Sequence, residues 1–275
     1  MLARGIASAL RHALAMLVTL GAVPVVTAAY ALDADSAVQG NGLVLNWTTC
    51  SVGLKQGAAW ARFSTRTVTV LGGPDSYFDP SSIPAINAVG SETIHSASIT
   101  GALQGACNWQ VNRFVYGLEG DISYERLTGT AGAGATYPCC PPTGFTLTST
   151  AHSSWLVTVR PRIGFLIMNW MPFISGGVAT GKLNGDFVFR DDNSAAFASG
   201  SVSNTVLGFS FGTGVEVALN RNWSLEGEYL DIRFGNAANV STNLTFDSGR
   251  SPSNVFTHRV DLCVRVLTLG ANFRF

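Results

Sequence analysis

The sequence predicts an all-β fold: an eight-stranded antiparallel up-and-down transmembrane β-barrel with four long extracellular loops. Two observations carry this prediction. Segments of about ten residues alternate between apolar and polar side chains, and short and long connections join them in turn. Charged residues make up only 12% of the 275-residue chain, whereas soluble domains contain about 25%. The formal net charge is zero, which gives no indication of a nucleic-acid partner.

The beginning of the chain predicts export. Basic residues precede an apolar run that ends in small residues, the pattern of a secretory signal peptide over residues 1–31. An uncleaved anchor helix is the alternative for this segment. After it, no charge-free apolar stretch is long enough for a transmembrane helix. We expect residues 32–45 to form a short periplasmic segment and residues 46–275 to form the outer-membrane barrel.

The segment from Trp155 to Phe165 shows the alternation most clearly. Its odd-numbered residues are apolar, with aromatic rings at both ends, whereas its even-numbered residues include Arg160 and Arg162. Charges confined to one face predict lipid on one side of the strand and a polar lumen on the other. The same parity places further charges on the lumen face of three other segments: Glu119, Asp121, Glu216, Glu226 and Glu228.

The connections set the number of strands. Three are short and four are long, and long connections are expected on the outer side of the membrane. Several long connections contain strand-like stretches, so a ten-stranded barrel is the alternative. In the last strand the apolar residues change parity, which predicts either a bulge near Val266 or a change of environment above the bilayer. The expected strands lie near 46–59, 97–109, 113–125, 152–165, 171–183, 204–219, 222–234 and 259–275.

The lumen charges are expected to form a salt-bridge network that fills the barrel. Glu216 and Glu226 are predicted to face each other across a strand pair, which is unfavourable without counter-ions. Arg160 and Arg162 are the expected counter-ions, and Lys55 is a further one. The alternative is a charged constriction in a small pore, although an eight-stranded barrel is only wide enough for its own side chains.

Histidine gives the weak candidates for a metal or haem site. His95, His152 and His258 are each predicted at the loop side of a strand, near the outer mouth. Ser153 and Ser154 follow His152, but no acidic residue nearby completes a hydrolase arrangement. We therefore predict no enzyme activity and no cofactor.

The chain contains five cysteines, so at least one thiol is free or pairs with another molecule. Cys50 and Cys107 are expected near the periplasmic ends of adjacent strands, either as a disulfide or as small apolar side chains. Cys139 and Cys140 are adjacent, and no bond between them is expected because bridged residues usually lie about 4.4–6.8 Å apart. Cys263 is the fifth cysteine.

Aromatic residues are expected to form girdles at the two membrane interfaces. One group lies near the short turns and a smaller group lies nearer the loops. The residues are Trp47, Trp109, Phe114, Trp170 and Trp223 in the first group, and Tyr124, Trp155 and Tyr229 in the second.

Five segments follow one another in a recognisable order. They are NWQVNRFVYGLEGDISY, WLVTVRPRIGF, PFISGGVATGKL, GVEVALNRNWSLEGEYLDIRFG and the terminal LGANFRF. Over roughly residues 97–275 they resemble the small outer-membrane β-barrel proteins of the OmpA-like superfamily, especially the outer membrane immunogenic or porin-family proteins of alphaproteobacteria. The first strand, with WTTCSVG, departs from the family pattern because it lacks a glycine and an aromatic residue.

The resemblance implies an eight-stranded barrel in the bacterial outer membrane, in contact with its lipid and lipopolysaccharide. It also implies that the terminal aromatic residue Phe275 is read by the barrel-assembly machinery. The expected function is non-enzymatic, a contribution to envelope structure and surface properties. The alternatives are a narrow porin for small solutes, and a surface receptor or adhesin that binds haem or host molecules through its loops.

Overall fold

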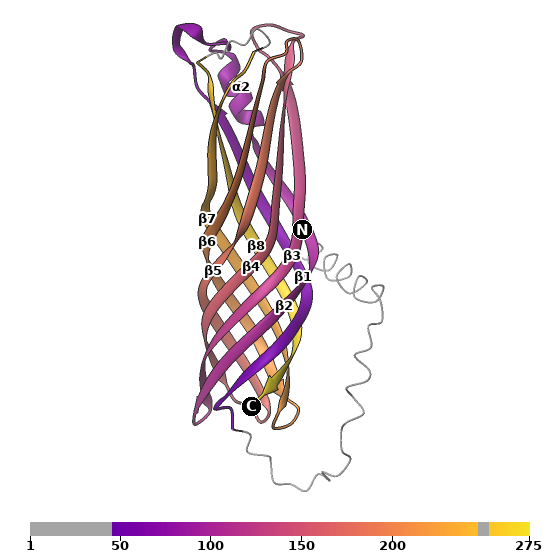
Figure 1. Cartoon of the computed structure of the whole chain (residues 1–275), viewed down its shortest axis with the longest axis vertical. Helices are drawn as coiled ribbons and strands as arrows, with labels where there is room; N and C mark the ends of the chain where they lie inside the picture. Colours follow the sequence, from indigo (N-terminus) through magenta and orange to yellow (C-terminus); the bar gives the residue numbers. More distant parts are fainter. Residues whose placement is uncertain (1–45, 247–252) are drawn as a thin grey trace, which may run out of the picture. The chain divides into compact units, whose positions relative to one another are not determined.

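The computed structural model describes residues 46–246 and 253–275. The predicted signal peptide and the segment 32–45 lie outside the described residues and stay predictions. Eight antiparallel strands pair in chain order, and the first pairs with the last to close a barrel (Figure 1). The predicted eight-stranded barrel is confirmed, and the ten-stranded alternative is wrong. The strands are β1 (Thr49–Thr69), β2 (Ser91–Val111), β3 (Phe114–Thr136), β4 (Gly144–Phe165), β5 (Trp170–Asp191), β6 (Phe197–Ala218), β7 (Trp223–Asn243) and β8 (Val255–Arg274).

The strands are much longer than a membrane requires. They contain 20 to 23 residues, whereas a tilted strand crosses the bilayer in about 9–11. The prediction of four long extracellular loops is therefore corrected, because Ser- and Thr-rich stretches that we assigned to loops pair as continuations of the strands. The outer connections are reduced to residues 70–90, 137–143, 192–196 and 244–254.

Residues 70–90 alone keep a long connection among these four. They contain the short 3-10 helix η2 (Gly73–Asp75) and the helix α2 (Ser82–Val89). In Figure 1, α2 lies at the end of the barrel opposite the C-terminus. Over residues 46–246 and 253–275, no helix is long and apolar enough to cross a membrane.

The polarity of the two strand faces reverses about halfway along the barrel. On β8, Leu267 and Leu269 point outward and are exposed, whereas Val264 and Val266 point inward and are buried. Arg265, between the two valines, points outward. The pairing of β8 with β1 is unbroken over this stretch. Of our two predictions for the last strand, the change of environment is therefore correct and the bulge is wrong.

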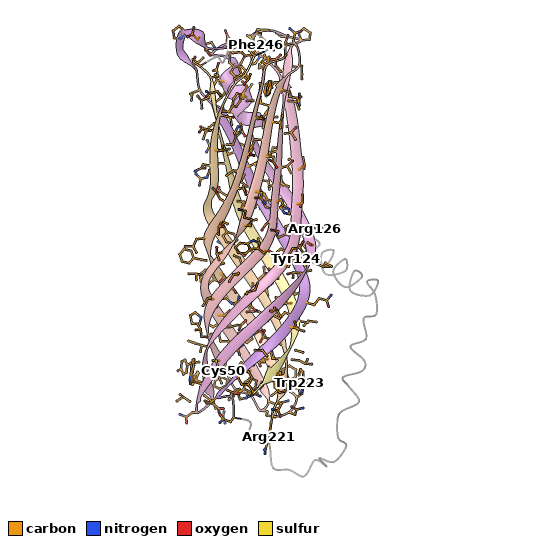
Figure 2. All side chains as sticks on the ribbon, in the orientation of Figure 1. Cys50, Tyr124, Arg126, Arg221, Trp223 and Phe246 are labelled. Carbon is orange, nitrogen blue, oxygen red and sulfur yellow. A yellow bond between two sulfur atoms is a disulfide. The ribbon has the colours of Figure 1, made fainter. Side chains whose placement is uncertain are left out.

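The reversal divides the barrel into two parts. We call the part with apolar outward residues, from the short turns to the level of Trp60, Tyr124, Tyr229 and Leu267, the membrane half. We call the remainder the outer half, because its outward side chains are polar and suit water. Figure 2 shows Tyr124 and Arg126 at this boundary, near mid-height, with Cys50 and Trp223 near the short turns.

The interior of the outer half is an apolar core. It consists of two clusters of buried side chains: one has members from all eight strands, and the other includes Ile86 of the helix α2 at the far end. In its lower part a cluster surrounds Phe63, Leu127, Leu156 and Phe187. In its upper part Phe78 and Ile86, from the connection that contains α2, pack against inward residues. These inward residues include Phe145, Phe189 and Phe256.

A third, smaller apolar cluster fills the bore near the short turns. Trp47, two residues before β1, packs with Val115, Met171 and Phe173 and is fully buried. The Arg274 guanidinium lies 4.6 Å from the centre of the Trp47 ring. Trp47 therefore belongs to the interior. Its predicted place in the lipid-facing aromatic girdle near the short turns is wrong.

Candidate functional site: the charged layer inside the barrel

The charged layer lies inside the membrane half, between the cluster around Trp47 and the apolar core of the outer half. Strand register brings its members together: Glu119 on β3 lies opposite Arg160 on β4, and Glu216 on β6 lies opposite Glu226 on β7. All seven lumen charges that the sequence predicts face inward and are buried. Lys55, from β1, joins them.

Lys55 lies at the centre of the layer. Its Nζ atom is 2.7 Å from a carboxylate oxygen of Glu226 and of Glu228, 2.9 Å from Glu119 and 3.3 Å from Asp121. The carboxylate oxygens of Glu119, Asp121 and Glu228 lie within 4.8 Å of one another, a spacing that also suits a metal ion. The Lys55 ammonium supplies positive charge to this cluster, and its side chain is only 2% exposed.

Arg160 binds three acids of the same cluster. Its Nη2 atom is 2.6 Å from Glu119, 2.7 Å from Asp121 and 2.9 Å from Glu228. Its other terminal nitrogen donates a hydrogen bond to the hydroxyl of Thr158. The side chain is completely buried, so these groups replace water around its two terminal nitrogens, while its Nε atom has no hydrogen-bond partner among the described residues.

Arg162 links this cluster to the acids nearer the short turns. Its terminal nitrogens lie 3.0 Å from Glu119, 3.0 Å from Glu216 and 3.3 Å from Glu226. Its Nε atom donates to the side-chain oxygen of Asn108 at 3.0 Å. Each arginine and Lys55 therefore contacts three or four acids, and the layer is one connected network rather than a set of pairs.

Neutral side chains complete the network, and the sequence analysis missed them. Gln104 and Asn272 each donate a hydrogen bond to Glu226 at 3.1 Å. The Ser224 hydroxyl donates to Glu216 at 2.6 Å. All three residues occupy inward positions of their strands, so strand parity would have found them had polar uncharged side chains been included.

Five acids face three cations in this network, an excess of two negative charges if all are ionised. Donors from amides and hydroxyls offset part of this excess, since they stabilise carboxylates without adding charge. None of the eight side chains is more than 7% exposed. The arrangement can join the barrel walls through the interior of the barrel.

The three histidines do not form a common site. His258 points into the core of the outer half and stacks on the Phe187 ring at 4.6 Å. Its two ring nitrogens lie 2.8 Å from the Thr67 hydroxyl and 3.1 Å from the Thr242 hydroxyl. His95 and His152 instead face outward from β2 and β4. The predicted ring of histidines around the mouth is therefore wrong, because strand parity sends one of them to the opposite face.

The buried position of His258 predicts a pH effect on stability. Burial lowers the pKa of His258 from 6.5 to about 4. Between these values the unfolded chain binds a proton that the folded chain excludes, so stability decreases as the pH falls. We expect this residue to account for about 2 kcal/mol of lost stability between pH 7.5 and pH 5. Urea titrations at both pH values, compared between the wild type and His258→Phe, measure this difference.

The comparison of the two pH values removes the pH-independent cost of the substitution itself. His95→Phe serves as the control, since it changes an exposed histidine of the same barrel. An equal loss of stability in the wild type and in His258→Phe would show that His258 accepts its proton in the folded state.

Two pairs of cysteines are bonded. Cys50 and Cys107 lie opposite each other on β1 and β2 and form a disulfide, the first of the two predicted alternatives. Cys139 and Cys140 are also joined, which corrects our expectation. Their Cα atoms are 3.8 Å apart, the spacing of neighbouring residues, and the bond closes within a hydrogen-bonded turn between Tyr137 and Thr143. Cys263 is a free thiol, half-buried on the outward side of β8.

Comparison with known proteins identifies the family to which the chain belongs. The family model described as "Outer membrane protein beta-barrel domain" matches residues 15–275. The 31 kDa outer-membrane immunogenic proteins of Brucella melitensis biotype 1 and Brucella suis biovar 1 are each 31% identical to the chain over 219 residues, which cover 79% of this chain and 82% of theirs.

Solved structures with a similar backbone include the outer membrane protease OmpT of Escherichia coli and the outer membrane protein OprG of Pseudomonas aeruginosa. Each has a TM-score of 0.42 and 9% identity, and the matches cover 87% and 84% of this chain and 99% of each of theirs. The family match over almost the whole chain and the similarity to the Brucella proteins give the conclusion: the chain belongs to the outer membrane protein β-barrel family, and its place is the bacterial outer membrane.

Proposed function

We propose that the protein is a sealed, non-enzymatic barrel that contributes to the structure and surface properties of the outer membrane. The filled bore supports this proposal. A path through the barrel would pass the cluster around Trp47 and Phe173, then the charged layer, and then the apolar core around Leu127. Water-filled porins have a polar interior, whereas two of these three layers are apolar.

The contacts across the bore suit a mechanical role. The charged layer ties β1, β3, β4, β6 and β7 together through side chains rather than through neighbouring backbones. The Cys50–Cys107 disulfide adds a covalent link between β1 and β2 near the short turns. In the outer half, the apolar core holds the same strands together beyond the lipid. With these contacts, the barrel acts in our proposal as a stiff rod that is anchored in the membrane and extends outward from it.

Planar-bilayer recording tests the proposal against the narrow-pore alternative. We expect no reproducible conductance steps from the wild type, while a 16-stranded porin in the same bilayer shows them. Removing bulk from the apolar layers, with Trp47→Ala, Phe173→Ala and Leu127→Ala combined, should increase the background of brief openings. Stable steps in the wild type that disappear in Glu226→Gln would contradict a sealed barrel and favour a charged constriction.

A further inference from the structure

The outward charges of the barrel are not evenly distributed along its height. A basic residue follows the apolar surface of the membrane half on five of the eight strands. On β3, for example, Arg126 comes two residues after the exposed Tyr124, and Figure 2 shows the two at the same boundary. We call this set the basic collar. Its members are Arg62 on β1, Arg126 on β3, Lys182 on β5, Arg233 on β7 and Arg265 on β8.

Three members of the collar lie on adjacent strands. Arg62 and Arg233 are both opposite Cys263, from β1 and β7, and therefore flank β8 on its two sides. Arg265 lies on β8 itself, between Trp60 and Asp231. Neighbouring strands are about 4.8 Å apart, so the backbones of the outer two arginines are separated by roughly 10 Å. Flexible side chains at this spacing can approach one anionic group or two adjacent ones.

Acidic residues do not neutralise this group. Asp231 is the acid that pairs with it, at 2.7 Å from Arg233 and 3.4 Å from Arg265. The two arginine side chains remain 71% and 64% exposed. Over residues 46–246 and 253–275, no salt bridge involves Arg62, Arg126 or Lys182. Asp261 is a second outward acid near this height, two residues from Cys263 on β8, and it pairs with Arg259 at 3.4 Å. The five positive charges of the collar therefore exceed the two acids near them.

The level of the collar identifies its partner. Aromatic residues at the edge of an apolar surface mark the membrane interface, and Trp60, Tyr124 and Tyr229 lie beside or just below the collar. Its charges consequently lie where lipid headgroups lie. Exposed guanidinium groups bind phosphate through paired, charge-assisted hydrogen bonds. We propose that the basic collar, and chiefly Arg62, Arg233 and Arg265, binds the phosphate groups of lipopolysaccharide in the outer leaflet.

Lipid capture in nanodiscs tests this proposal, whether or not the barrel conducts. The full chain is placed in phosphatidylcholine nanodiscs with either bis-phosphorylated lipid A or its dephosphorylated form, and native mass spectrometry counts the lipid that stays bound. We expect the wild type to retain the phosphorylated form preferentially. The triple variant Arg62→Gln, Arg233→Gln, Arg265→Gln should lower apparent affinity for that form by roughly 10- to 100-fold, with little effect on the other.

Arg190→Gln is the matched control, because Arg190 is also exposed on the outward side but lies near the far end of β5. Asp231→Asn provides an independent variant that should strengthen binding, since it removes the acid that competes for two arginines. Added inorganic phosphate separates a headgroup site from a free-anion site: it should not displace the lipid at equal concentration. Equal losses in the triple variant for both forms of lipid A, or in Arg190→Gln, would overturn the proposal.

Discussion

Replacing Arg160 with leucine is expected to lower the free energy of unfolding by about 3–5 kcal/mol, since removing one partner of a buried ionic network leaves the others uncompensated. Arg160 is completely buried and contacts Glu119, Asp121 and Glu228. Leucine fills part of the space but donates no hydrogen bond. The remaining cations, Lys55 and Arg162, already contact several acids each and cannot take over all three contacts.

Urea unfolding in phospholipid vesicles, followed by tryptophan fluorescence and by heat-modifiable migration on gels, measures this loss. Arg233→Leu is the control, because Arg233 also pairs with an acid at 2.7 Å but is 71% exposed. Exposed pairs contribute little to stability, so the control should unfold close to the wild type. If Arg160→Leu also unfolds like the wild type, water rather than the protein must compensate the three acids, and the barrel interior is wetter than its packing indicates.

Replacing Lys55 with methionine is expected to destabilise the barrel by a similar amount, about 3–5 kcal/mol. Methionine keeps most of the length of the side chain and removes the ammonium that four carboxylates share. Five acids then face two cations, so repulsion among Glu119, Asp121 and Glu228 is no longer offset at its centre. The same unfolding assay measures the change.

A second substitution separates lost charge balance from lost packing. In Lys55→Met combined with Glu228→Gln, one negative charge is removed next to the missing positive charge, and the double variant should be more stable than Lys55→Met alone. This coupling is expected because the two groups are 2.7 Å apart and share partners. Additive losses in the double variant would mean that packing around the lysine stem, rather than charge, determines its contribution.

The sequence was sufficient to predict the charged layer because lumen residues obey a rule with period two. In a membrane strand, lipid forbids charge on one face, so Glu119, Arg160 and Glu226 could be assigned to the interior without knowing their contacts. Short connections then place neighbouring strands in antiparallel pairs. What this reasoning could not provide is the central position of Lys55, because its contacts cross the bore from β1 to β3 and β7.

The outer half was missed for a physical reason. Where water replaces lipid outside the barrel, the apolar residues lie on the inward face and the polar residues on the outward face. Inward and outward polarity therefore exchange within a single strand. Stretches such as Thr146, Thr148 and Thr150 on β4 then expose hydroxyl groups, as a loop would. Leu147 and Ala151, between and beside them, are buried in the core. Reading each strand with a reversal of polarity near its middle would have recovered this part of the barrel.

The length of the strands determines how far the outer turns stand from the membrane. About half of each strand, on the order of ten residues at 3.3 Å each, continues past the lipid and raises the turns by roughly 25–30 Å after allowance for strand tilt. Because the tip is separated from the charged layer by the apolar core, substitutions at the tip leave the contacts of the membrane anchor unchanged.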